Sequence, residues 1–571
     1  PTPGHPELDL ARGIENTSGP LGQGHTMAVG AAIAERFLVA RLGELFTHKT
    51  FAFISDGGIQ EEISQGAGRL AGFLGLNNLV MFYDSNDIQL STETKAVTAE
   101  DTAMKYTSWG WKVISITGND QDQIRKALKE AVEELDKPVL IIGKTIMGLG
   151  LLDNDGNSFE RKTSTHGMPV SEAGGSFEKS LVNLGGDSAD PFKVFGDVKS
   201  LYDQILKEKK KSAGEWKRRK ELWASENPEL DRKLHLFYSG NIPEIDFSAI
   251  AQKENSATRA SSSAVLAVLA AKIENMIVAS ADLSNSDKTD GFLKKTKAFS
   301  RGDFSGAFLQ AGVAELTMAA VMNGMALHGG VIPACGTFFV FSDYMKPAVR
   351  LACLMGLPVK YIWTHDAFRV GEDGPTHQPV EQEAQIRLME QMKNHSGSNS
   401  MIVLRPADSA ETTVSWKLAL ENKSTPSALL LSRQNITDLP SAGGGEPQAP
   451  WGGHRRAAMG RTRRDADRAS LHAGPLGPRS QGLRLPDRAD PPLAMGQFHL
   501  DRHRTRRQPH ADRVKRLRRI PPHHRRFGGR AGQWRRGPRG GARSPPAPPP
   551  AGARVVGAGA RRTGTPVRAD Y

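Results

Sequence analysis

The sequence predicts an α/β protein built from parallel sheets in two domains. Short apolar runs of strand length alternate with longer helical patterns in residues 1–175, and the same alternation restarts in residues 251–437. Polar residues follow the apolar runs, as expected where the carboxyl ends of parallel strands form ligand sites. We therefore expect two α/β domains with these boundaries, a mostly helical linker over residues 176–250, and a tail over residues 438–571.

Three buried strands are expected in the first domain. A glycine-rich loop, Gly19–Gly24, precedes a helix of small residues. The first strand ends at Ser55-Asp56-Gly57-Gly58, and the second ends at Asp84-Ser85-Asn86. The predicted strands cover residues 49–54, 78–83 and 138–143, and the predicted helices cover residues 27–41, a segment ending near 74, and 121–136.

The second domain is predicted to repeat this pattern. A helix over residues 261–273 precedes the first of its strands. The predicted strands cover residues 276–280, 358–363 and 427–431, and they end at Ala281-Asp282, Thr364-His365-Asp366 and Ser432-Arg433. The linker carries a Lys/Arg-rich run at residues 207–220, which we interpret as a solvated helix face.

The composition indicates a soluble globular protein. Apolar residues make up 38% of the chain and charged residues 24%, and no apolar run approaches the length needed to cross a membrane. The two cysteines, Cys335 and Cys353, stand in apolar surroundings, which argues against a disulfide framework and for a reducing compartment. We therefore expect a cytoplasmic protein with no membrane partner.

The net charge of +13 originates in the tail. Residues 1–440 contain 46 Lys and Arg against 54 Asp and Glu, whereas residues 441–571 contain 29 against 8. The tail is rich in Arg, Gly, Pro and Ala without helical or strand periodicity, so we expect it to be disordered. A nucleic-acid-binding segment, a flexible linker and a frame-shifted GC-rich reading frame all fit this composition. The abrupt change near residue 441 favours the last, so a nucleic-acid partner is not expected.

The polar residues after the first two strands are candidate metal ligands. Asp56 and Asn86 stand 30 residues apart, each just past a predicted strand. If the two strands are neighbours, a carboxylate, an amide oxygen and the backbone carbonyl of Ile88 converge, and such oxygen ligands suit Mg²⁺ when phosphates complete its shell. Gly57 would let a diphosphate approach the backbone where a helix begins.

The most informative segment is Gly371-Glu-Asp-Gly-Pro-Thr-His-Gln-Pro379. It combines two acids, an imidazole and a hydroxyl in a stretch whose Gly and Pro residues disfavour a helix. It follows a predicted strand and the polar triplet Thr364-His365-Asp366, at the edge where α/β sheets bind ligands. This combination favours a ligand-binding loop over an ordinary surface turn.

These motifs together resemble the transketolase family. Asp56-Gly57 with Asp84-Ser85-Asn86 is similar to the family's bipartite thiamine-diphosphate motif. The Gly19–Gly24 loop, Thr364-His365-Asp366 and Gly371–Pro379 also resemble the family, in the same order, so that the resemblance covers roughly residues 1–437. It implies a pyrophosphate-type domain and a pyrimidine-type domain that bind thiamine diphosphate. The implied activity is transfer of a two-carbon ketol unit from a ketose phosphate to an aldose phosphate in the pentose phosphate pathway.

The resemblance also implies roles in cofactor binding. Mg²⁺, or Ca²⁺ or Mn²⁺ in its place, would bind Asp56, Asn86 and the Ile88 carbonyl. Glu315 would bond the aminopyrimidine ring and favour its reactive tautomer. The other implied cofactor contacts are Gly19, Leu21, Gly57, Asn86, Asp282, Phe338, Phe341 and Tyr344.

Substrate contacts and a homodimer follow from the same resemblance. His5, His166 and His377 resemble the family's histidines that face the substrate hydroxyls and exchange protons. The sugar phosphate would contact Arg259, Ser286, His365, Asp373 and Arg433, where guanidinium groups suit forked phosphate recognition. In this family the diphosphate domain of one subunit faces the pyrimidine domain of the other, so active sites are expected at the subunit interface.

Two departures from the family pattern leave alternatives open. The family's segment ahead of His5 and its third domain after Arg433 have no counterpart in this sequence. We therefore expect either an active transketolase of which this chain is an incomplete version, or a catalytically inactive remnant. A nucleic-acid-binding protein that uses the Arg-rich tail is a distant third interpretation.

Overall fold

The computed structural model describes residues 4–367 and 369–439. All of them fall within one compact unit. The expectations for the tail, residues 438–571, lie outside the described residues except at positions 438 and 439. No helix in the described part of the chain is long and apolar enough to cross a membrane.

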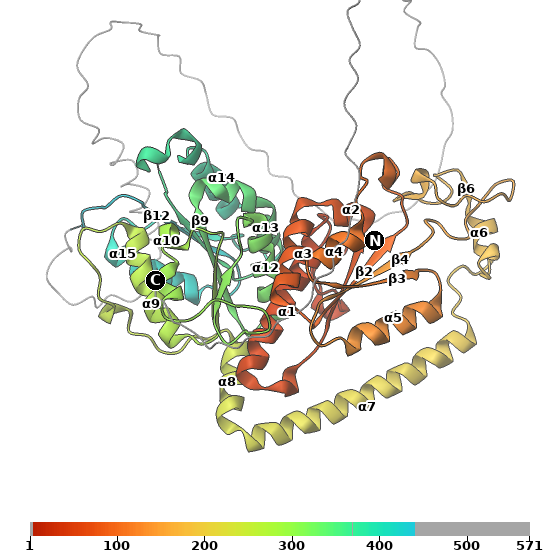
Figure 1. The fold of residues 1–571 in the computed structure, drawn as a ribbon, viewed down its shortest axis with the longest axis horizontal. Coiled ribbons are helices and arrows are strands. Elements are labelled where there is room, and N and C mark those ends of the chain that lie inside the picture. Colours follow the sequence, from red (N-terminus) through yellow and green to blue (C-terminus); the bar gives the residue numbers. More distant parts are fainter. Residues whose placement is uncertain (1–3, 368, 440–571) are drawn as a thin grey trace, which may run out of the picture. The chain divides into compact units, whose positions relative to one another are not determined.

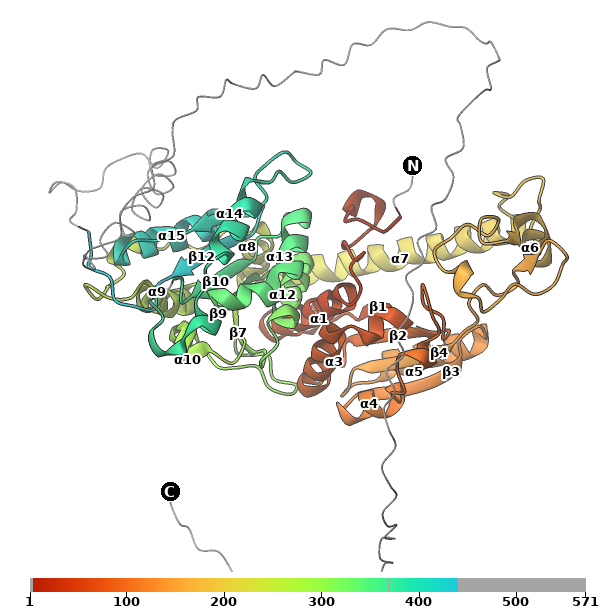
Figure 2. The same cartoon turned by 90° about the horizontal axis from the view of Figure 1, so that it is seen from above.

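The first sheet has four parallel strands in the order β1-β2-β4-β3 (Figure 2). Its strands are β1 (Thr50–Ser55), β2 (Leu79–Ser85), β3 (Lys112–Thr117) and β4 (Val139–Lys144). Its helices are α1 (Gln23–Leu42), α2 (Asp56–Gln60), α3 (Glu62–Leu74), α4 (Thr102–Ser108) and α5 (Gln121–Glu133). β1 and β2 pair with Ser55 opposite Asp84, so the two strands that carry the predicted metal ligands are neighbours.

The second sheet has six parallel strands in the order β11-β12-β10-β9-β7-β8. Its strands are β7 (Met276–Ser280), β8 (Phe308–Gln310), β9 (Ile332–Phe338), β10 (Lys360–Thr364), β11 (Ile402–Leu404) and β12 (Ser427–Leu431). Its helices are α9 (Thr258–Lys272), α10 (Ser284–Asp287), α11 (Asp290–Leu293), α12 (Glu315–His328), α13 (Ser342–Met355), α14 (Gln382–Gln391) and α15 (Ser409–Glu421). The parallel pairing in both sheets confirms the predicted fold class.

The segment between the sheets is mainly helical. A short hairpin of β5 (Leu152–Asp153) and β6 (Gly175–Ser176) leads into α6 (Phe177–Asn183). α7 (Gly196–Glu226) follows as a single long helix, then α8 (Pro228–Ser239), as Figures 1 and 2 show. No residue of α7 is buried, which agrees with a solvated face for the Lys/Arg-rich run at 207–220.

α1 and α12 connect the two sheets through a close helix crossing (Figure 2). A Cβ on Gly30 would lie 2.1 Å from the Val321 carbonyl oxygen, and one on Gly324 would lie 1.9 Å from the Met27 carbonyl oxygen. Only glycine permits this approach of the two backbones. Because Glu315 begins α12 and the glycine-rich loop leads into α1, the crossing fixes how these two groups of predicted residues lie within one chain.

Candidate functional site

Asp56 stands at the start of α2, directly after β1. Its Oδ2 accepts the backbone N–H groups of Asn86 and Asp87, both at 3.0 Å. Its Oδ1 accepts the hydroxyl of Tyr83 at 2.6 Å. The Asn86 side-chain oxygen accepts the backbone N–H of Ile88 at 3.0 Å. The structure thus brings Asp56 and Asn86 together from two neighbouring strands, and Ile88 joins them through its backbone N–H.

The chemistry of these donors fits a hard divalent cation. Each carboxylate oxygen of Asp56 keeps further acceptor capacity beyond its hydrogen bonds. Asp56 is buried, and this burial raises the pKa of its carboxyl, so a cation beside it would favour the ionised form. In the described part of the chain no group of three or more His, Cys, Asp or Glu could hold a metal ion. The site here has a single carboxylate combined with neutral oxygens, which leaves room for ligand phosphates.

The glycine-rich loop lies next to these residues. A Cβ placed on Gly19 would lie 3.3 Å from Cβ and Cγ of His5. A Cβ placed on Gly57 would lie 3.1 Å from Cδ1 of Leu21. The absence of side chains at both glycines therefore allows His5 and Leu21 to approach the backbone, and four predicted residues come together in two adjacent pairs.

The five residues predicted to bind substrate form one network. Nη1 of Arg259 donates to the backbone oxygen of Ser286 at 2.7 Å and lies 3.4 Å from Nε2 of His365. Oδ2 of Asp373 lies 4.0 Å from that His365 nitrogen and 3.7 Å from Nε of Arg433. Two guanidinium groups and a carboxylate therefore surround one imidazole, and such guanidinium pairs suit a phosphate.

His365 is held in one position and one protonation state. It follows β10 with φ of 59° and is 1% exposed. Burial, together with the cations Arg259 and Arg433, lowers the pKa of His365 to about 3. Its Nδ1 forms a hydrogen bond of 2.9 Å with the Thr364 hydroxyl. The ring is therefore neutral at physiological pH and acts as a hydrogen-bonding group rather than a cation.

Aromatic rings extend this network to His377. The centroid of Phe338 lies 3.7 Å from that of His365 and 5.8 Å from that of Phe341. The Phe341 ring lies 5.4 Å from the ring of His377 and 6.0 Å from that of Tyr344. The predicted aromatic residues and one predicted catalytic histidine thus form a continuous surface.

A cavity of about 780 Å³ adjoins these rings. Four predicted residues line it: Asp282, Glu315, Phe341 and Tyr344. Glu315 is 8% exposed, and burial raises the pKa of its carboxyl. Asp282 follows β7 with φ of 61°.

Other residues that line the cavity were not predicted from the sequence. They come from α3, where Glu62, Gln65 and Arg69 line the cavity. Their spacing of three and four residues places them on one helix face. This spacing is the sequence feature that could have predicted a shared polar surface. Tyr83, which donates to Asp56, was also missed.

The structure does not connect His166 to the other predicted residues. It follows the short turn Thr163–Thr165, and its buried Nδ1 has no hydrogen-bond partner among the described residues.

The residues around Asp56 do not contact the His365 network directly. Within residues 4–367 and 369–439, no hydrogen bond, ion pair or ring contact joins the two groups. A single chain therefore presents two separate groups of predicted residues.

Comparisons with known proteins match most of the described part of the chain to one family. The model of the transketolase thiamine diphosphate binding domain matches residues 1–243, and that of the transketolase pyrimidine binding domain matches residues 254–438. A transketolase of Halalkalibacterium halodurans is 40% identical over 452 residues, which cover 77% of this chain and 65% of the relative. The chain thus spans less than two thirds of the length of two such curated relatives, 65% and 64%.

Solved structures give the same result. A transketolase from Leishmania mexicana aligns with a TM-score of 0.71 and 33% identity, covering 77% of this chain and 64% of that one. A transketolase from Pichia stipitis in complex with sedoheptulose-7-phosphate aligns with a TM-score of 0.67 and 32% identity, covering 75% of this chain and 63% of that one.

Proposed function

We propose, from the premise that this chain belongs to the transketolase family, that it transfers a two-carbon ketol unit from a ketose phosphate to an aldose phosphate. The observation that carries the proposal is the network of Arg259, His365, Asp373 and Arg433, which offers two guanidinium groups and fixed hydrogen-bonding partners to a sugar phosphate. The Pichia stipitis relative bound to a ketose phosphate supports this class of substrate.

The cofactor in this proposal is thiamine diphosphate with a divalent metal ion, Mg²⁺ in the first place. When bound, the cofactor supplies the nucleophilic carbon that this chemistry requires. Asp56, Asn86 and the Ile88 carbonyl would hold the metal, and Gly57 would allow the diphosphate close to the start of α2. These roles are supported by the hydrogen bonds that join Asp56 to Asn86 and Asn86 to Ile88, and by the helix that begins at Asp56.

Glu315 is assigned to the pyrimidine ring of the cofactor. Burial raises the pKa of its carboxyl. In this proposal the carboxyl group of Glu315 forms a hydrogen bond with a ring nitrogen. Phe338, Phe341 and Tyr344 would pack around that ring, and Asp282 would border the same cavity. Gly19 and Leu21 would border the central part of the cofactor.

Residues of the His365 network would bind and orient the substrate. Arg259, Ser286 and Arg433 would bind the phosphate, and Asp373 would accept a substrate hydroxyl. Neutral His365 would donate or accept one hydrogen bond without adding charge. His377, with His5 and His166, would move protons to and from the substrate oxygens.

The proposal includes a homodimer with active sites at the subunit interface, acting in the cytoplasm in the pentose phosphate pathway. The homodimer is supported by the lack of any direct contact, within the described part of one chain, between the Asp56 group and the His365 network. A second copy would supply the missing half of each site.

The test is a two-carbon transfer assay on the full chain. A ketose phosphate donor and an aldose phosphate acceptor are supplied with and without thiamine diphosphate and Mg²⁺. Product should form only when both are present, and a chelator should abolish its formation. A folded chain that forms no product at saturating cofactor would instead be the inactive remnant.

A further inference from the structure

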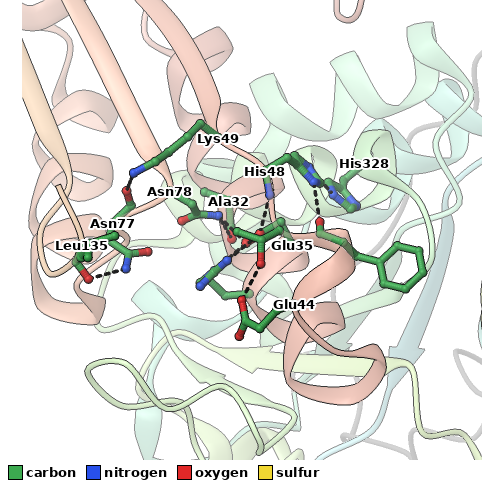
Figure 3. Close-up of polar contacts among 12 residues, drawn as sticks. Ala32, Glu35, Glu44, His48, Lys49, Asn77, Asn78, Leu135 and His328 are labelled. Carbon is green, nitrogen blue, oxygen red and sulfur yellow. Dashed lines mark hydrogen bonds and ion pairs between the residues drawn. The ribbon is translucent and has the colours of Figure 1, made fainter. Parts of the chain in front are cut away.

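Two histidines face each other away from the proposed active site (Figure 3). His48 lies between the turn Glu44–Phe46 and β1, and His328 is the last residue of α12, at the opposite end from Glu315. Their Nε2 atoms are 3.3 Å apart, and their ring planes differ by 7°. The pair therefore links the loop before β1 to a helix of the second sheet.

The other nitrogen of each ring determines where its hydrogen is. Nδ1 of His48 lies 2.9 Å from the backbone oxygen of Phe46, and Nδ1 of His328 lies 3.0 Å from that of Gly329. A carbonyl oxygen only accepts, so both Nδ1 atoms must carry hydrogen. In two neutral rings, both Nε2 atoms would then direct lone pairs at each other. That contact is repulsive unless a positive species lies between them.

We propose that His48 and His328 form a binding site for one shared cation, either a proton or a divalent metal ion that prefers imidazole ligands, such as Zn²⁺. The geometry accommodates both. A shared proton gives one N–H···N hydrogen bond. A tetrahedral metal with bonds of about 2.0–2.1 Å separates two ligand nitrogens by roughly 3.3 Å. Metal-binding histidines commonly donate their other N–H to a backbone carbonyl, as both rings do here.

The surroundings of the pair allow a single positive charge. Glu35 of α1 is buried and accepts the backbone N–H of His48 at 2.9 Å (Figure 3). Glu35 is also paired with Arg36. Burial lowers the pKa of His328, which disfavours a second proton on the pair. Lys220 of α7 and the α8 residues His235 and Tyr238 line a cavity of about 740 Å³ together with His48. Glu44 of the preceding turn is a further charged group near the pair.

A cation in this site would fasten the end of α12 to the loop before β1. If the shared cation is a proton, the stabilisation is present over the pH range in which the pair holds one proton. It declines as pH rises and that proton leaves, and it declines again on acidification, when a second proton must enter the pair beside half-buried His328. An isolated histidine does not give such a two-sided profile. With a metal ion, the stabilisation appears instead when both rings are free of extra protons.

The test compares thermal unfolding midpoints of the full chain, His48→Phe and the control His235→Phe from pH 5 to pH 8.5. When a chelator is present, the unmodified chain should have a higher thermal unfolding midpoint than His48→Phe. This difference should be largest at a pH near the usual histidine pKa of about 6.5. Its size at the peak should be roughly 2 °C. With equimolar ZnCl₂ at pH 8, the midpoints of the unmodified chain and of His235→Phe should rise, and that of His48→Phe should not. The first result identifies a proton, and the second a metal ion.

The proposal is overturned if the unmodified chain and His48→Phe give parallel pH profiles and zinc shifts all three proteins equally. If His48→Phe does not fold, ¹⁵N-histidine NMR of the unmodified chain replaces it. Both rings should then be protonated at Nδ1 with one further proton, or one zinc ion, per pair. Two rings that titrate independently, or a neutral ring protonated at Nε2, would exclude a shared cation.

Discussion

We expect Gly324→Ala, a change of one methyl group, to destabilise the protein at the crossing of α1 and α12. A Cβ at this position would lie 1.9 Å from the Met27 carbonyl oxygen, 2.6 Å from its carbonyl carbon and 2.7 Å from its Cα. These are backbone atoms of a buried helix, so no side-chain rotation relieves the contact. The two helices must move apart.

The magnitude follows from two opposing effects. Within a helix, Ala is otherwise more stable than Gly by roughly 0.5–1 kcal/mol. Forcing an extra methyl group into a packed interior costs about 1–3 kcal/mol. Because all three close contacts are with backbone atoms of Met27, which cannot rotate away, we expect a net loss of about 1–2 kcal/mol in the free energy of unfolding.

Gly214→Ala provides the matched control. Gly214 lies in exposed α7, and a Cβ placed on it would meet nothing within 4 Å, so the same substitution should raise stability there by roughly 0.5–1 kcal/mol. Urea unfolding followed by circular dichroism measures both. If Gly324→Ala is as stable as the unmodified chain or as Gly214→Ala, the reasoning about this crossing is refuted.

Three further predictions concern the site and its pH dependence. Glu315→Gln should lower kcat by about 100-fold or more without lowering the thermal midpoint, and a kcat within a factor of three of the unmodified chain would remove Glu315 from the chemistry. Arg259→Met should raise KM for a phosphorylated ketose by roughly 10–100-fold and leave KM for the unphosphorylated sugar unchanged; an equal rise for both would argue against phosphate binding. His25 is buried, and burial lowers its pKa to about 4, so the unfolded chain takes up a proton first as pH falls below about 6.5. The unmodified chain should therefore lose about 2 kcal/mol of stability between pH 7 and pH 5 from this group, and His25→Leu should not. Urea midpoints at the two pH values measure this difference, and equal losses in both proteins would exclude it.

Strands with continuous apolar sequence were predictable, and interrupted strands were not. The expected burial of the strand at 49–54 was wrong, because β1 is an edge strand that exposes Phe51 and Phe53. The strands predicted at 276–280 and 427–431 coincide with β7 and β12. β9 was not predicted because Pro333 and Gly336 interrupt it, and both residue types normally mark turns or strand ends. β8 and β11 have three residues each, too few for a periodic signal.

The position of the site at the strand ends was also predictable, whereas its contacts were not. Asp56 and Asn86 meet because each follows a strand of one parallel pair. The stacking of Phe338 on His365 depends on the pairing of β9 with β10, which sets Phe338 opposite Thr364. No local pattern encodes that register. The α3 wall of the cavity likewise depends on tertiary packing, where Gly66 lets Thr317 approach α3.

The most direct test of the account is complementation between two inactive chains. Asp56→Ala removes the proposed metal ligand, and Glu315→Ala removes the proposed pyrimidine contact, which a homodimer would place in the same active site from different subunits. Each variant alone should be inactive. An equimolar mixture, after subunit exchange, should recover about one quarter of the unmodified activity, because half of the dimers are mixed and each has one intact site. A mixture as inactive as its components, with an unmodified chain that is active, would contradict a site shared between two copies.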